Sequence, residues 1–401
     1  MKNSKLLVMF ITFAIMIAIT PFIFNKLMNA KFNQMLDNLK KEGVVIKELK
    51  SKSTYLTTDR VFDVEIPQKV LGDNGIKYIK LRVEAVFKNL PVTDVKFFGK
   101  VKEVILKNFT DIQNAQFNSV IKDKIKFLVI TPNFKTYKYK VFDNKILLDD
   151  NGAVLGYEGI NGIVYIHNDL IKESTNIPKL YLNDNKNFLF QLNSLKESSV
   201  SEANVTKSSS NMNIIIKIKD KTISLNNINT NSVSTIAKRA NAIAKVSVND
   251  INIFNKIFLN KVDLNFEIKN VYYPIVEKIQ NKPKPNENDL IVLIEKGLNL
   301  NYGLKIKNIK IQNKDLGFID LNAKIKVRPT QNIKEKINQK NLDFIDLTFN
   351  LKTTPEIEMI LMNVIPQSAF AFAAADKKNG IIDLQIEFKN NEVYINGQKV
   401  K

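Results

Sequence analysis

The sequence predicts a β-rich α+β protein, in which an N-terminal transmembrane helix precedes a large antiparallel, amphipathic β-sheet body with a few short packing helices. Three observations support this fold class. Residues 6–24 form an apolar run without a charge. From Val44 onward, apolar and polar residues mostly alternate, which is the period of strands with one buried face. A few short segments instead repeat apolar residues at helical spacing.

The apolar run predicts a single-pass anchor in the inner membrane. At 1.5 Å per residue its 19 residues span about 28 Å, close to the roughly 30 Å hydrocarbon core of a bilayer. Lys2 and Lys5 precede the run and favour a cytoplasmic stub of residues 1–5 with the body in the periplasm. The predicted partner is therefore the inner-membrane lipid bilayer, contacted through Leu6, Phe10, Ile15, Ile19 and Phe24.

A cleaved signal peptide and a buried core helix are the alternatives to this anchor. Cleavage requires small residues in an A-x-A-like pattern. The nearest candidate ends at Ala30, but Met28 occupies a position where a small residue is needed. The apolar run is also longer than the roughly 7–15 residues of a signal-peptide core. Both features favour a retained anchor.

Residues 25–42 are predicted to continue from the anchor as a helical stalk. Gly43 is a suitable stop residue. The helical spacing is carried by Leu27, Ala30, Lys31, Met35, Leu36 and Leu39.

Residues 43–270 are predicted to form a β-rich periplasmic region. Ile76 to Phe87 is its clearest strand, because every second residue from Ile79 onward is apolar. Residues 89–124 fit a helix or strands equally well. Residues 194–211, rich in Ser, Asn, Glu and Lys, predict a loop, and the prolines and asparagines of 271–288 predict the main internal break.

Residues 289–401 are predicted to form a C-terminal β-rich region with helices at 289–296 and 356–365. In the second helix, Ile357, Ile360, Leu361, Val364 and Ile365 share one face. The strands between the helices alternate cleanly, so each sheet has one wet face and one apolar face. We expect both helices to pack on the apolar face.

The net charge of +20 is consistent with nucleic-acid binding, but the residue types argue against it. Arginine, the residue that recognises bases and phosphates bidentately, accounts for only four of the 60 basic residues. The lysines are dispersed along strands, as on a solvated face. Attraction to anionic lipid headgroups near the anchor is the alternative. Cysteine is absent, which excludes disulfides and thiolate chemistry.

No pattern of catalytic or ligand-binding residues stands out. His167 is the only histidine and follows a predicted strand, as a turn residue would. Asp149 to Gly152 has turn chemistry, and its spacing does not fit a calcium loop. The spacing of Gly156, Gly159 and Gly162 misses the dinucleotide fingerprint. The sequence therefore predicts a protein that is not an enzyme, with no catalytic, cofactor-binding or metal-binding residues.

Two segments of the last third carry a family resemblance. They are LIEKGLNLNYGLKIKNIKIQNKDLGFIDLNAKIKV at 293–327 and IDLQIEFKNNEVYINGQKV at 382–400. Together with the apolar N-terminal run and the stretch from Tyr55 to Val64, they resemble the YdgA-like family of bacterial envelope proteins, a family of unknown function. The resemblance implies an inner-membrane-anchored periplasmic protein of a Gram-negative bacterium.

Two functions remain open at this point. The first is a structural or protein-interaction role with other envelope proteins. The second is binding or transfer of lipids or other apolar molecules along an amphipathic β-sheet groove. The coverage of the apolar face distinguishes them, because a face filled by packing side chains leaves a lipid no site.

Overall fold

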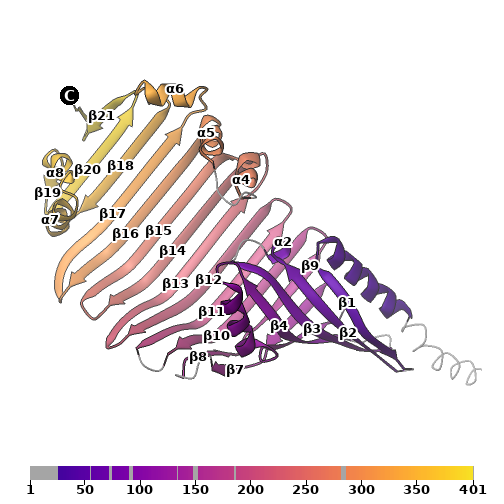
Figure 1. The fold of residues 1–401 in the computed structure, drawn as a ribbon. Helices are drawn as coiled ribbons and strands as arrows, with labels where there is room; N and C mark the ends of the chain where they lie inside the picture. Colours follow the sequence, from indigo (N-terminus) through magenta and orange to yellow (C-terminus); the bar gives the residue numbers. More distant parts are fainter. Residues whose placement is uncertain are drawn as a thin grey trace, which may run out of the picture. The chain divides into compact units, whose positions relative to one another are not determined.

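The computed structural model describes residues 26–54, 56–71, 75–89, 94–132, 134–147, 152–184, 187–280 and 286–400. Strands make up 61% of the structure, and few helices accompany them (Figure 1). The chain divides into two compact units, the first comprising Met1–Asn168 with Glu173–Asn185 and the second Asp169–Lys172 with Lys186–Lys401. These findings confirm a β-rich protein built on antiparallel sheet.

In the first unit, six strands pair in chain order and β9 pairs with the sixth, all antiparallel. The short strands β7 and β8 pair with each other, and β8 pairs with β10. The strands are β1 (Val45–Ser53), β2 (Thr57–Pro67), β3 (Ile76–Lys88), β4 (Val95–Leu106), β5 (Lys126–Thr131), β6 (Thr136–Val141), β7 (Asn144–Leu147), β8 (Val154–Glu158), β9 (Asn161–His167) and β10 (Leu170–Asn183).

A helix over residues 26–41 covers one face of this sheet, so these residues are not a free stalk. Phe32 is only 1% exposed, and its ring lies 5.6 Å from Phe62, 6.1 Å from Phe87 and 5.8 Å from Phe97, centroid to centroid. Leu36, one turn later, is buried in the same cluster. The helix was predicted correctly, but its buried face was not: Phe32 belongs to that face, whereas Leu27 and Leu39 are exposed.

Arg60 on β2 joins the helix to the sheet. Its Nε and Nη2 donate to the two carboxylate oxygens of Glu48 at 2.8 and 2.9 Å, and Nη1 donates to Asn33 Oδ1 at 2.7 Å. The guanidinium carbon also lies 4.8 Å from the centre of the Phe32 ring. These hydrogen bonds lower the pKa of Glu48. One buried arginine therefore connects β1, β2 and the helix.

Residues 89–124, for which helix and strand were both open, contain one of each. They hold β4 and the helix α3 (Asp111–Ile121), which begins with a capping box between Thr110 and Gln113. Two asparagines of α3 continue the hydrogen bonding of β4. The amide of Asn118 exchanges both bonds with the backbone of Val104, and Asn114 does the same with Leu106.

Gly162 on β9 lies beneath the ring of Tyr139 on the neighbouring β6. A side chain at this position would collide with that ring and with the carbonyl of Ser174. The regular glycine spacing at 156–162 therefore has a packing role here, because the aromatic rings of adjacent strands occupy the space above the backbone.

The second unit is a sheet of long antiparallel strands that pair in chain order from β11 to β18 and then with β20. Its strands are β11 (Phe188–Glu202), β12 (Val205–Ile218), β13 (Lys221–Thr235), β14 (Arg239–Ile253), β15 (Ile257–Tyr272), β16 (Leu298–Ile311), β17 (Lys314–Val327), β18 (Ile345–Thr353), β19 (Asp376–Lys378), β20 (Ile381–Lys389), β21 (Glu392–Ile395) and β22 (Gln398–Lys399).

The loop predicted at 194–211 is wrong, because these residues belong to the paired strands β11 and β12. The prediction failed because the segment lacks apolar alternation. Hydroxyl side chains take the place of apolar ones, and several bond across the strands. Ser208 and Ser232 are 2.7 Å apart, as are Ser210 and Thr230.

The break predicted at 271–288 is not a domain boundary. β15 pairs with β16 along almost its whole length, so the sheet continues across this segment. The chain between β15 and β16 instead contains α4 (Tyr273–Gln280), in which Pro274 lies, and α5 (Glu287–Glu295). The boundary between the units lies instead around residues 168–186.

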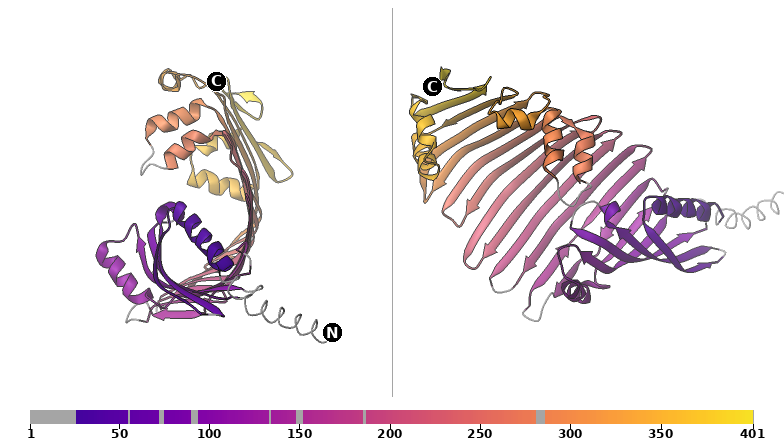
Figure 2. Two further views of the ribbon diagram at one scale, coloured as in Figure 1. Left: turned by 90° about the vertical axis from the view of Figure 1, so that its right-hand side faces the viewer. Right: turned by 45° about the horizontal axis from the view of Figure 1, so that its top comes forward.

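Both predicted C-terminal helices are present, as α5 and as α7 (Pro355–Val364), and α8 (Ser368–Ala373) follows α7. α7 packs on the sheet through Ile357 and Leu361, as expected. α5 packs instead against α4 and α6 (Ile333–Asn338). Asp289 of α5 forms an ion pair with Lys278 of α4, with 3.0 Å between Oδ1 and Nζ. Figure 2 (left) shows α4, α5, α7 and α8 on the same side of this curved sheet.

The predicted anchor, Leu6 to Phe24 with the residues Leu6, Phe10, Ile15, Ile19 and Phe24, lies outside the described residues. From residue 26 onward, in the ranges given above, no helix is both long and apolar enough to cross a bilayer.

Candidate apolar binding face

The two faces of the second unit's sheet differ completely in chemistry. Cross-strand register aligns β12 to β17 into rows that run across the sheet. One face presents the rows Thr206–Ser234–Ala242–Ile268–Leu300–Ile325, Ser208–Ser232–Ala244–Phe266–Tyr302–Ala323, Ser210–Thr230–Val246–Leu264–Leu304–Leu321 and Met212–Ile228–Val248–Val262–Ile306–Ile319. No member of these four rows is charged.

The opposite face carries the charges of the same strands. One of its rows is Asn211–Asn229–Ser247–Asp263–Lys305–Asp320, and Lys305 pairs with Asp320 at 3.0 Å. Two rows further along the same face, Glu267 bonds with Lys269 and Asn301, and these hydrogen bonds lower the pKa of Glu267. A strand with water on one side alone would alternate in this way. The apolar side therefore faces something other than bulk water, or is covered.

Coverage of the apolar side is partial. The row from Met212 to Ile319 is packed: Ile228, Val248, Val262 and Ile306 are buried, in one cluster with Ile357 of α7. Further along the sheet, Phe372 of α8 packs over Leu351 and Leu384. Helices thus fill one end of the face, as predicted for α7 but not for α5.

The other three rows are less covered on β14 to β17, although Val246 and Leu304 pack partly against the cluster of Ile357 and Leu321 against that of Phe372. None of their twelve members there is fully buried. Phe266 and Tyr302, which pair directly, are 45% and 41% exposed. We call these twelve residues the open apolar face: Ala242, Ala244, Val246, Leu264, Phe266, Ile268, Leu300, Tyr302, Leu304, Leu321, Ala323 and Ile325.

Hydroxyl groups border the open apolar face on β12 and β13. Thr206, Ser208, Ser210, Thr230, Ser232 and Ser234 continue the three accessible rows. A molecule lying on the face would therefore meet apolar side chains along β14 to β17 and neutral hydrogen-bonding groups at one edge. The sequence pattern predicted the apolar side of β17 and β18, but it did not reveal this border.

Comparison with protein-family profiles, with curated proteins and with solved structures finds no match. The resemblance to the YdgA-like family therefore stays a prediction. The arguments for function rest on the geometry of the chain itself.

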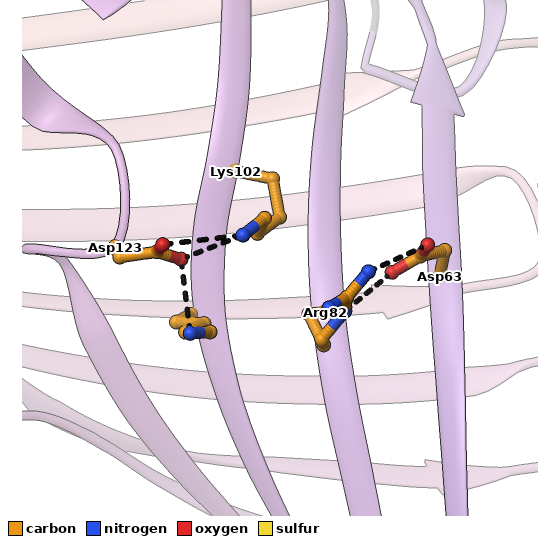
Figure 3. Close-up of polar contacts among 5 residues, drawn as sticks. Asp63, Arg82, Lys102 and Asp123 are labelled. Carbon is orange, nitrogen blue, oxygen red and sulfur yellow. Dashed lines mark hydrogen bonds and ion pairs between the residues drawn. The ribbon is translucent and has the colours of Figure 1, made fainter. Parts of the chain in front are cut away.

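In the first unit, the sheet face opposite the helix over 26–41 carries charged side chains. Figure 3 shows the contacts of Asp63, Arg82, Lys102 and Asp123. Arg82 donates to Asp63 at 2.8 and 3.0 Å, which lowers the pKa of Asp63. Burial raises the pKa of Asp123, but ion pairs with Lys102 and Lys100 at 3.1 Å outweigh it and lower the pKa overall. A depression of about 350 Å³ lies beside Asp63, Arg82 and Lys102. Its charged lining consists of four basic side chains (Lys47, Lys80, Arg82 and Lys102) and two acidic ones (Asp63 and Glu65), and exposed ion pairs of this kind contribute little to stability.

The remaining candidate residues show no catalytic arrangement. His167 ends β9, is exposed, and stacks on Tyr165 with 6.4 Å between ring centroids. Within the ranges the structure describes, no three His, Asp or Glu side chains gather as a possible metal site. Asp149 and Asp150 lie outside those ranges.

Proposed function

We propose that this is a single-pass, inner-membrane-anchored periplasmic protein that binds lipid acyl chains on the open apolar face of its second unit. The observation that supports this function is the exposed pair Phe266 and Tyr302 in the middle of an uncharged surface. The chain has a net charge of +20, yet the strands beneath this surface direct their lysines to the other face. A sheet with water on both faces would not need to place all its lysines on one of them.

The energetics favour an elongated apolar ligand. Four strands about 4.8 Å apart and three rows about 7 Å apart give a surface of roughly 14 Å in each direction. Each methylene transferred from water onto it contributes about 0.8 kcal/mol. An acyl chain of about ten buried methylenes thus gains enough to offset the loss of translational freedom, which costs at least about 4 kcal/mol.

The test is lipid binding by the purified full-length chain in detergent. Mass spectrometry should detect co-purifying lipid, and a phospholipid with a fluorescent acyl chain should bind saturably. Phe266→Glu and Tyr302→Glu should each weaken binding about tenfold, equivalent to about 1.4 kcal/mol, because a charge on the face must be desolvated by the ligand. Both positions are exposed, so the fold should persist.

Val233→Glu is the matched control. Val233 is apolar and 39% exposed, but it lies on the opposite face, in the row of Glu267. The control should bind lipid as the parent chain does. Repeated absence of co-purifying lipid, or an equal effect of all three substitutions, would refute the lipid-binding function.

A structural role among envelope proteins is the second candidate. The exposed apolar residues of α7, with Met359 55% and Val364 72% exposed, favour it, because they could contact another protein. The same lipid assay separates the two functions, since a structural protein would show no saturable acyl-chain binding. Under either function we expect a non-enzymatic protein without a cofactor or nucleic-acid partner.

A further inference from the structure

One end of the first unit combines exposed lysines with exposed leucines. Because neighbouring strands are antiparallel, the C-terminal ends of β1, β3 and β5 lie beside the N-terminal ends of β2, β4 and β6, at one end of the first unit. The register shows this directly: Ser53 faces Thr58, Thr57 faces Lys88, and Val95 faces Thr131. We call this strand end the lysine rim.

The lysine rim also lies beside the point where the chain enters the unit. The helix over 26–41 ends next to the beginning of β1, and Figures 1 and 2 show its beginning beside the β1–β2 hairpin end. The apolar run of the predicted anchor ends at Phe24, two residues before the first described residue of this helix. Headgroups around the end of that anchor would therefore meet the rim.

The charge of the rim suits an anionic partner. Apart from the buried Arg60, its described charged residues are eight exposed lysines and three acidic residues, namely Lys26, Lys50, Lys52, Lys88, Lys96, Lys135, Lys138 and Lys140 with Asp59, Glu84 and Asp94. Asp59 faces Lys52 across β1 and β2 and offsets part of its charge. The nearby Glu48 is bonded by Arg60.

Leucines at the same end suit the interface between headgroups and acyl chains. Leu27 and Leu49 are exposed, and Leu56, at the hairpin end, is 54% exposed. Lysine with exposed leucine is the composition of segments that lie in a membrane interface. A soluble protein partner would be expected to bury such leucines in a closed patch, whereas these are spread along a rim.

We propose that the lysine rim rests on the anionic headgroups of the leaflet from which the anchor emerges, holding the first unit against the membrane. This inference rests on the anchor part of the proposed function but not on lipid binding by the open apolar face. The contact fixes one end of the first unit at the membrane surface and directs its other end, with α2 (Gln68–Leu71), away from it.

The absence of cysteine from the chain permits a direct test with single labels. Leu56→Cys places a nitroxide on the rim. Val70→Cys, 42% exposed on α2, is the matched control at the other end of β2, about 36 Å away for 11 extended residues. The full chain is inserted into lipid nanodiscs that contain phosphatidylglycerol, with nickel chelated to lipid headgroups as the relaxing agent.

The label at Leu56 should relax strongly and the label at Val70 should not. Replacing phosphatidylglycerol by phosphatidylcholine, or raising the salt, should weaken the effect at Leu56. Lys50→Gln and Lys52→Gln should each reduce the equilibrium constant for contact about fivefold, because a lysine near an anionic surface contributes roughly that factor. Alkaline extraction is measured on every variant as the check of insertion.

Equal relaxation at Leu56 and Val70 in an inserted chain would overturn the inference. Failure of the parent chain to insert would overturn it together with the anchor. Loss of fluorescent-lipid binding in detergent, by contrast, would affect only the proposed function. If the relaxation at Leu56 changed neither with lipid charge nor with the two lysine substitutions, the inference would also be wrong, because the anchor alone would then account for the closeness of the rim to the membrane.

Discussion

Replacement of Phe32 by alanine tests whether residues 26–41 belong to the folded first unit. The side chain is fully buried among Phe62, Phe87 and Phe97. Removing a buried phenylalanine costs about 3–5 kcal/mol through lost transfer energy and the cavity left behind. Three ring contacts at 5.6–6.1 Å place this site toward the upper part of that range.

The measurement is urea unfolding of the full chain in mild detergent, followed by far-ultraviolet circular dichroism and by protease sensitivity of the first unit. The matched control is Leu39→Ala, because Leu39 belongs to the same helix but is 39% exposed. We expect the control to change stability by less than about 0.5 kcal/mol. If Phe32→Ala is no worse than Leu39→Ala, the helix is a free stalk and the packing argument is wrong.

Three further predictions follow from other contacts. Arg60→Gln should destabilise the first unit by about 2–4 kcal/mol, because it leaves a buried hydrogen-bonding site half satisfied. In the parent chain the folded-state pKa of Glu48 is lowered, so the stability that Glu48 contributes is present above its ordinary pKa of 4.5 and is lost as the pH falls through the lower, folded-state value. Glu48→Gln should therefore flatten that part of the acid-unfolding curve. Gly162→Val should cost about 1–3 kcal/mol in thermal unfolding through collision with Tyr139, whereas Gly303→Ala, which meets only ordinary contacts, should be neutral or slightly stabilising; equal effects would refute the packing role. Protease added to spheroplasts should digest the body, and protection there would contradict the periplasmic orientation.

The accuracy of the sequence-based predictions depended on what each side chain packs against. Ile319 to Val327 alternates because one face is apolar and the other wet, so both strand and facing were predictable. Lys196 to Asn211 obeys the same backbone pairing, but Ser208 and Ser210, in rows that are apolar further along the sheet, carry hydroxyls that bond to Ser232 and Thr230 of β13. Periodicity in hydrophobicity cannot detect such a strand.

Phe32 and Leu27 illustrate the same limit in a helix. Both lie at positions compatible with an apolar stripe, and the sequence favoured Leu27. Phe32 is the buried residue because the aromatic side chains of β2, β3 and β4 surround it, whereas Leu27 lies exposed at the rim. The role of Asn114 and Asn118 could not be predicted either, because it depends on α3 lying beside the edge of β4, where their amides bond to the backbone.

By itself, the sequence determined the β-rich class, the alternation of the C-terminal strands, the two helices at α5 and α7, and the absence of thiol chemistry. These follow from local periodicity and composition, which each segment carries alone. Only the tertiary structure decided that α7 packs over one row of the apolar side and that Phe266 and Tyr302 stay exposed. It also decided that β15 and β16 pair across the excursion that contains α4 and α5, and that lysines distant in sequence share one strand end. Those facts depend on register and on which elements meet, and register is set by pairing between segments that no local pattern specifies.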